Sequence, residues 1–305
     1  MAVYEHNYKP FTGKTTPTWS RFLIIPRNAY RAVFSSKIFI MFFAVCFIFP
    51  LIMSILVYLK HNTNALGIFQ AQLNDLIPID ASFFFTFVWV QCYLAFFLSV
   101  LIGPPLISRD VENNGLPLYF ARPFTRTEYV IGKMCVLLIL TSLMTWVPGL
   151  LLFGFESYLE GWTWFSENAW MAGAIYFGCF LWIVFISLFT LAVSAWVKWR
   201  VVASGILVGL FFIPRALAGM ITVATFTNYG NLISLQTNFT NIWLGLFGLF
   251  SRDAMRVPMN YGGSASREII FWEPPLWGSW AMIVFVALIL LTMLYLKVRA
   301  YEVVR

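Results

Sequence analysis

Six apolar stretches divide this chain, and each is long enough to cross a lipid bilayer. They cover roughly residues 38–59, 83–106, 134–154, 169–197, 201–223 and 276–296. A stretch of about 22 residues forms a helix of ~33 Å, which exceeds the ~30 Å hydrocarbon core of a bilayer. A soluble domain of 305 residues cannot hide a sequence that is 60% apolar and 11% charged. We therefore expect an all-α integral membrane protein with six transmembrane helices.

Basic residues set the expected orientation, because cytoplasmic loops of membrane proteins carry an excess of lysine and arginine. With a cytoplasmic N-terminus, fifteen of the 20 basic residues fall inside, and the outer segments keep Lys60, Arg252, Arg256 and Arg267. Both termini are thus predicted to be cytoplasmic, in what we expect to be a bacterial inner membrane. The net charge of +7 is interpreted as an anchor to anionic lipids and not as a nucleic-acid footprint.

A cytoplasmic segment, residues 1–37, precedes the membrane domain, residues 38–305. Apolar residues recur in it at helical spacing with arginines between them: Trp19, Phe22, Leu23, Pro26, Tyr30, Val33 and Phe34. This pattern is typical of an amphipathic helix lying on the inner membrane surface. We expect such an elbow helix, bent near Pro26, to set the angle of span one. The alternative is that these residues are simply the frayed start of that span.

A charged island, residues 107–133, separates the second and third spans on the predicted cytoplasmic side. Gly103-Pro104-Pro105 removes two backbone donors, so the second helix is expected to kink or stop there. Thr125 and Glu128 have the spacing of a capping box, which predicts that span three begins near Arg126. Residues 107–122 then have room for one short helix parallel to the membrane.

The connection before the last span, residues 224–275, is expected outside. Its apolar run 242–250 is too short to span and is predicted to be a re-entrant or interfacial helix, in preference to a buried strand. Six tryptophans suit an outer aromatic belt: Trp162, Trp164, Trp243, Trp272, Trp277 and Trp280.

Motifs for chemistry on this chain are weak. Gly13-Lys14-Thr15 resembles the tail of a phosphate-binding loop, but Tyr8 stands where the first glycine belongs. His6 and His61 have no metal-ligand spacing, and the cysteines (Cys46, Cys92, Cys135 and Cys179) are interpreted as small packing residues. We therefore expect no catalytic residue, metal or cofactor on this chain.

Arg215, after Pro214 in span five, is the strongly polar residue that stands out within the spans. Two interpretations stay open: a structural arginine whose head snorkels or meets backbone carbonyls, and a guanidinium that lines a transport pathway. The first four spans and the last contain no Asp, Glu, Lys, Arg or His near their middle, which argues against a transporter driven by an ion gradient. The driving energy would then come from another protein.

The island resembles the loop between spans two and three of type-2 ABC exporter permeases. In that family an acidic residue, a short helix, a Pro-x-Ser/Thr-Arg step and a Gly-Lys pair follow one another at this spacing. Glu112, Pro123, Arg126, Gly132 and Lys133 match. Where the family usually has the motif Glu-Gly-Thr, this chain has Asn113-Asn114 after the glutamate. It also has Pro117 within the expected short helix. The motif covers under a tenth of the chain.

The resemblance implies an ABC-2 type permease: six transmembrane helices, an N-terminal elbow helix and an outer re-entrant or cap segment before the last span. The island would be a coupling helix docked on a separate ABC ATPase, which binds ATP and magnesium and is present in two copies. Membrane lipids and a second permease chain would complete the assembly, as a homodimer or with a sibling permease. The residues expected to dock the ATPase are Arg109, Asp110, Glu112, Pro123, Arg126, Gly132 and Lys133.

Two other functions remain as alternatives to export of an unidentified substrate. One is a membrane anchor or assembly subunit whose ATPase partner drives a machine outside the membrane. The other is an integral-membrane transferase, which needs a catalytic pair or metal cluster at one membrane face. The available acids are Glu156, Glu160 and Glu167, which are expected in a solvated outer loop with no histidine or cysteine beside them.

Overall fold

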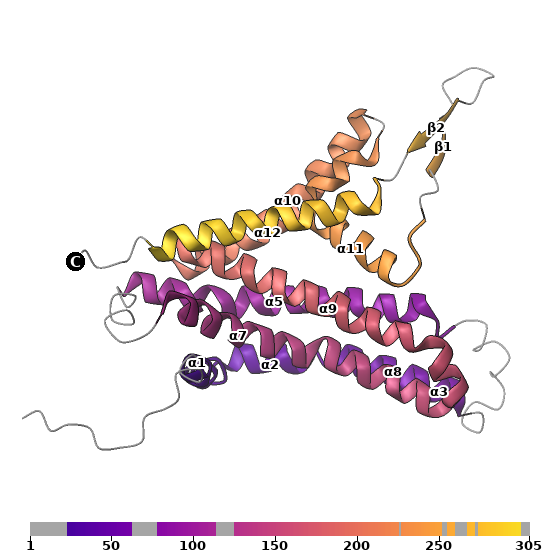
Figure 1. The fold of residues 1–305 in the computed structure, drawn as a ribbon, viewed down its shortest axis with the longest axis horizontal. Helices are drawn as coiled ribbons and strands as arrows, with labels where there is room; N and C mark the ends of the chain where they lie inside the picture. The colour runs from indigo at the N-terminus through magenta and orange to yellow at the C-terminus, as the bar shows by residue number, and fades with distance from the viewer. Residues whose placement is uncertain are drawn as a thin grey trace, which may run out of the picture.

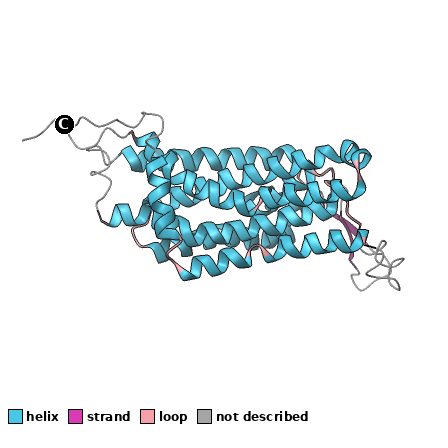
Figure 2. Ribbon diagram, turned by 90° about the horizontal axis from the view of Figure 1, so that it is seen from below, coloured by secondary structure: helices cyan, strands magenta, loops and turns pink. Residues whose placement is uncertain are grey.

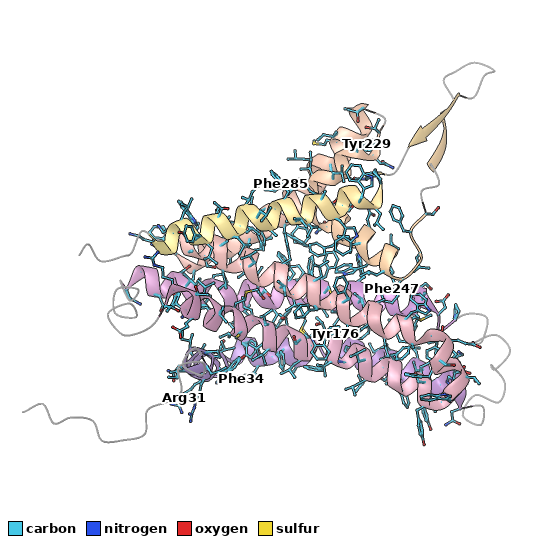
Figure 3. All side chains as sticks on the ribbon, in the orientation of Figure 1. Arg31, Phe34, Tyr176, Tyr229, Phe247 and Phe285 are labelled. Atoms are coloured by element: carbon cyan, nitrogen blue, oxygen red, sulfur yellow. The ribbon has the colours of Figure 1, made fainter. Side chains whose placement is uncertain are left out.

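Six helical segments of the described chain are long and apolar enough to cross a membrane, which confirms the predicted number of spans. The structure is a computed structural model, and it describes residues 23–62, 78–113, 125–225, 227–251, 255–259, 267–271 and 274–299. Apolar side chains also cover the outside of the bundle, as Phe285 illustrates (Figure 3). A surface of this kind is suited to lipid.

The helices form an elongated bundle in which most of the long ones lie roughly along one axis, whereas α1 lies across it (Figures 1 and 2). In chain order they are α1 Ile24–Val33, α2 Lys37–Val45, α3 Ile48–His61, α5 Ala81–Glu112, α7 Arg126–Met144, α8 Trp146–Glu160, α9 Trp162–Trp196, α10 Arg200–Thr225, the 3-10 helix η3 Asn228–Ile233, α11 Leu235–Leu246 and α12 Leu276–Arg299. Helices α2 with α3 form span one, and α7 with α8 form span three. We call the end of the bundle at which α1 lies and α5 ends the α1 end. The opposite end, at which α3 and α8 end and a two-stranded β-hairpin lies, is called the hairpin end.

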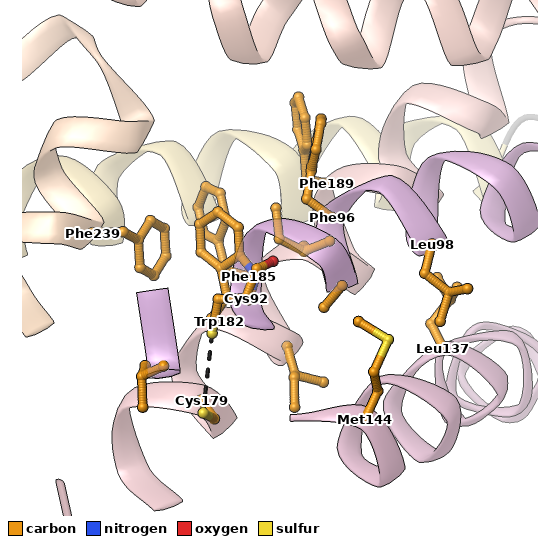
Figure 4. Packing of buried hydrophobic residues seen from close by; sticks show 14 of the residues in the cluster. Cys92, Phe96, Leu98, Leu137, Met144, Cys179, Trp182, Phe185, Phe189 and Phe239 are labelled. Carbon is orange, nitrogen blue, oxygen red and sulfur yellow. Dashed lines mark hydrogen bonds between the residues drawn. The ribbon is translucent and has the colours of Figure 1, made fainter. Parts of the chain in front are cut away.

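Helix α9 is the centre of the bundle and packs against α5, α7, α8, α10, α11 and α12. Its close approach to α5 depends on Gly103, where an added Cβ would lie 1.9 Å from Thr190 Cγ2. Farther along, Trp182 donates to the Cys92 carbonyl at 2.7 Å and packs edge-on against Phe239 (Figure 4). The cysteines within the described residues are free thiols, as their interpretation as packing residues requires.

Spans one and three are each broken once, and one buried glutamine lies at both breaks. Pro50 and Pro148 have no N–H, so the carbonyls four residues earlier, those of Cys46 and Met144, lose their helical donors. Gln91 Nε2 of α5 donates to the Cys46 carbonyl at 3.0 Å and to the Met144 carbonyl at 2.6 Å. A single amide therefore satisfies both carbonyls inside the bundle.

Helix α5 does not stop at Pro104 and Pro105, and the expectation of a separate short helix beginning at 107 was wrong for residues 107–112. Pro104 leaves the Val100 carbonyl without a helical donor, and Ser204 Oγ of α10 donates to it at 3.1 Å. A neighbouring hydroxyl can thus keep a proline-containing helix intact within a membrane bundle. Residues 114–122 of the predicted short helix lie outside the described residues.

The predicted elbow is a helix, α1, although Pro26 lies in its first turn and not at a bend. Trp19 and Phe22 lie outside the described residues. Tyr30 fixes α1 to span three, because its hydroxyl donates to the Cys135 carbonyl at 3.3 Å. Burial of this phenol raises its pKa to about 12, with the neighbouring Cys135 adding to the effect. Helix α1 therefore packs directly on α7.

The connection before the last span contains α11 and an antiparallel hairpin of β1 Met255–Met259 and β2 Arg267–Phe271, in which Val257 pairs with Ile269. The predicted short helix at 242–250 begins earlier, at Leu235, and ends at Leu246. Trp243 is not part of an aromatic belt: it is fully buried and donates to the Gly178 carbonyl at 3.2 Å. Trp162 and Trp277 are largely exposed, as a belt requires, and Trp272 lies outside the described residues.

Candidate functional site

The facing ends of α5 and α7 are joined at the α1 end by a buried ion pair. Lys133 Nζ lies 2.8 Å from Asp110 Oδ2 and donates to the Leu106 carbonyl at 2.7 Å. The Tyr129 hydroxyl donates to the same Asp110 oxygen at 2.7 Å, and the lysine lies over the tyrosine ring. Only 6% of Lys133 is exposed. We call Asp110, Tyr129 and Lys133 the clamp.

The clamp follows from where each helix places its residues. Tyr129 and Lys133 are four residues apart on α7, so both face α5. Asp110 is in the last turn of α5, on the part of the helix that continues past the two prolines. Because α5 continues as a helix past the prolines, its last turn places Asp110 beside Lys133.

Ser108 connects the same end of α5 to the end of α9. Its hydroxyl lies 2.8 Å from the Val197 carbonyl and 3.2 Å from the Ser194 carbonyl. Carbonyls at a helix C-terminus have no helical donor, so a side-chain hydroxyl is a suitable partner. Spans two, three and four are thus held together at the α1 end.

A capping box opens α7, as predicted. Glu128 N donates to Thr125 Oγ1 at 3.2 Å, and Thr125 N donates to Glu128 Oε2 at 2.7 Å. Reciprocal bonds of this kind fix the first turn of a helix. The chain therefore enters span three in a defined direction immediately after the island.

The seven residues predicted to dock an ATPase are not all brought together. Asp110 and Lys133 meet in the clamp, and Gly132 is buried beside them in α7. Glu112 is exposed at the end of α5, and Arg126 is the first residue of α7. Arg109 is in α5, where the structure describes its backbone alone, and Pro123 lies outside the described residues. Tyr129, which sequence analysis missed, is recognisable from its spacing to Lys133.

A groove of about 870 Å³ opens beside the clamp, between α1, α2, α5 and the start of α10. Its lining is mostly apolar and includes Ile25, Phe39, Phe97 and Leu101, and Asp110 and Lys133 also line it. The groove has the size and lining of a site for a small apolar or amphipathic molecule.

Arg215 lies on an exposed face of α10, which continues through Pro214 and is not broken there. Its Nη1 donates to Asn231 Oδ1 of η3 at 3.2 Å. The neighbouring Ile213 and Leu217 are exposed and apolar. An arginine on such a face is costly against lipid hydrocarbon, which favours water or another protein surface as its surroundings.

The acids at the hairpin end differ from expectation. Glu156 and Glu160 lie on α8 and Glu167 on α9, so none of them is in a loop, and Glu156 is fully buried. A histidine does accompany them: His61 Nε2 lies 3.1 Å from Glu160 Oε1, across 99 positions of sequence. The predicted topology could have indicated this pair, because it places the end of span one and the end of span three on the same side of the membrane.

Comparison of the sequence with protein-family models gives no match, and comparison with curated proteins gives none.

Proposed function

We propose that this chain is the transmembrane permease subunit of an ATP-driven exporter of the ABC-2 type. A separate ATPase would dock on the segment between α5 and α7 and supply the energy. The clamp is the observation that carries the proposal. It ties together the two helix ends that flank this segment, so a force applied there reaches both spans as one unit.

The force would also reach spans four and five. Ser108 bonds the end of α5 to the end of α9, and Ser204 of α10 bonds the Val100 carbonyl of α5. Rigid-body movements need such stiff connections between helices, because a packed interface shifts between discrete arrangements. Docking on one loop would in this way tilt several spans together.

The groove beside the clamp supports an amphipathic cargo. Its apolar wall is formed by α1, α2, α5 and α10, and the charged clamp residues Asp110 and Lys133 also line it. A molecule with an apolar body and a polar head would place the body against Phe39 and Phe97.

Glu112 and Arg126 provide the test, since they flank the docking segment and stand outside the clamp. We expect Glu112→Lys and Arg126→Glu to abolish ATP-dependent transport of cargo into proteoliposomes that carry the chain together with the ATPase that co-purifies with it. Membrane insertion should be unchanged. Glu167→Lys at the hairpin end is the matched control and should transport normally.

Normal export and normal ATPase stimulation in both variants would refute the docking role. If the variants lose ATPase stimulation and the wild-type protein moves no cargo into vesicles, the assembly-subunit alternative replaces export.

A further inference from the structure

Four ionisable side chains gather at the hairpin end, where α3 and α8 lie side by side (Figure 1). Lys60 and His61 come from the last turn of α3, and Glu156 and Glu160 from the last two turns of α8. Lys60 Nζ lies 3.4 Å from Oε1 of each glutamate. None of these residues belongs to the clamp or the groove.

The ring of His61 is oriented by the backbone of its own helix. Its Nδ1 lies 3.0 Å from the Val57 carbonyl, which must receive a hydrogen from it. In the neutral ring Nε2 then carries a lone pair, and this lone pair faces the Glu160 carboxylate at 3.1 Å. Two acceptors at this distance require a positive species between them, either a proton or a metal ion.

Glu156 adds a second carboxylate that is not satisfied. Its side chain is fully buried, and its Oε2 accepts no hydrogen bond from any residue that the structure describes. This oxygen lies 3.8 Å from His61 Nδ1. A buried carboxylate oxygen without a donor is costly, so the arrangement favours an additional cation.

Lys60 supplies part of the missing charge but holds the carboxylates loosely. Charge-assisted N–H···O bonds are ~2.7–2.9 Å long, whereas both of its contacts measure 3.4 Å. The lysine side chain is 24% exposed, so its head can swing into solvent. Lys60 is therefore a cation that a metal ion with stronger bonds to the carboxylates could displace.

We infer that His61, Glu156 and Glu160 form a binding site for a divalent transition-metal ion of the zinc class, which displaces Lys60. One donor atom from each residue can be chosen so that all three lie within 4.8 Å of one another. Donors around tetrahedral zinc are ~3.3 Å apart, given bond lengths of about 2.0–2.1 Å, close to the 3.1 Å between His61 and Glu160.

The donor set distinguishes between metals. An imidazole together with two carboxylates suits zinc and its first-row neighbours, whereas calcium and magnesium prefer oxygen ligands alone. The bond from His61 Nδ1 to the Val57 carbonyl is the kind of outer contact that orients metal-binding histidines. A bound ion would join the ends of spans one and three, whether or not the chain is a permease.

Metal binding can be measured on the full chain in detergent, purified without a polyhistidine tag and stripped with a chelator. We expect one Zn²⁺ per chain by elemental analysis and titration, and a visible Co²⁺ spectrum of tetrahedral type. His61→Gln and Glu160→Gln should each weaken zinc binding by more than about tenfold. Glu167→Gln, an acid outside the cluster, is the matched control and should bind as the wild type does.

Lys60→Gln gives the sharpest distinction, since it should tighten zinc binding by removing the competing ammonium. Gel filtration and circular dichroism would establish that the variants are folded. Glu156→Gln should weaken zinc binding too, and if this buried substitution fails the folding check, the variants at the partly exposed His61 and Glu160 still provide the test. Absence of stoichiometric zinc in the wild type, or unchanged affinity in His61→Gln and Glu160→Gln, would overturn the inference.

Discussion

Lys133 Nζ and Asp110 Oδ2 are 2.8 Å apart across the α5–α7 interface, and both side chains are largely withdrawn from solvent. The aspartate also accepts a hydrogen bond from Tyr129, and the lysine also donates to the Leu106 carbonyl. Each charge therefore has a second polar partner, which a buried ion pair needs in order to offset its desolvation. Spans two and three meet through charge at this point, in a bundle held together elsewhere mainly by apolar packing.

Removing one charge of this pair should destabilise the protein more than removing both. Lys133→Met leaves Asp110 without its cation, and we expect a loss of about 3–5 kcal/mol in unfolding free energy. The double variant with Asp110→Asn should recover part of this loss. Denaturant unfolding in detergent, arranged as a double-mutant cycle, measures the coupling. Purely additive losses would mean that the two charges do not interact.

Loss of the Gln91 side chain should destabilise the protein, because its amide bonds the breaks in spans one and three. Gln91→Met keeps the volume but leaves the Cys46 and Met144 carbonyls without a donor, at about 1–3 kcal/mol for each. Thr292→Val is the matched control, because Thr292 is exposed and bonds within its own helix. We expect Gln91→Met to lower the thermal midpoint of unfolding strongly and Thr292→Val to leave it almost unchanged. An unchanged midpoint in Gln91→Met would refute the bridging role.

The features that sequence could predict are those fixed by local chemistry. Length and apolarity locate the six spans, and the spacing of Thr125 and Glu128 locates the start of α7. Within α1, the helical spacing of Tyr30 and Val33 indicates the amphipathic face. In each case the residues that carry the pattern belong to one continuous segment of the chain.

The features that sequence missed depend on partners from other helices. A proline pair normally ends a helix, yet α5 continues through both prolines, and Ser204 Oγ of α10 lies 3.1 Å from the carbonyl that Pro104 releases. Glu160 looked like a solvated acid because its partner His61 is 99 positions away. Trp243 was predicted to lie in an interfacial aromatic belt, but the packing of α11 against α9 buries it. Spacing along one segment carries no information about such contacts.

Gly103 should tolerate no side chain unless α9 makes room. An alanine Cβ would lie 1.9 Å from Thr190 Cγ2, so we expect Gly103→Ala to cost about 1–3 kcal/mol through overpacking. Thr190→Ser removes that methyl group and should restore much of the stability. Gly205→Ala on α10 is the control, because its Cβ would meet no atom of the described residues within 4 Å. Thermal unfolding of the four proteins in detergent measures the effect, and equal midpoints for both alanine variants would contradict it.

Asp80 should make stability depend on pH in the acid range. Burial alone would raise the pKa of this carboxyl, but hydrogen bonds from the Ser82 hydroxyl and from the amides of Phe83 and Ser82 outweigh it and hold the pKa below its ordinary value of 3.8. Because the folded-state pKa is depressed, the stabilisation is fully present above pH 3.8 and is lost as the pH falls through the folded-state value. Asp80→Asn can still accept these bonds but does not ionise, so its stability should lack this acid-dependent component. Thermal midpoints measured from pH 6 down to about pH 3 would show the wild-type and Asp80→Asn curves converging, and parallel curves would rule out a stabilising role for the ionised carboxylate at the start of α5.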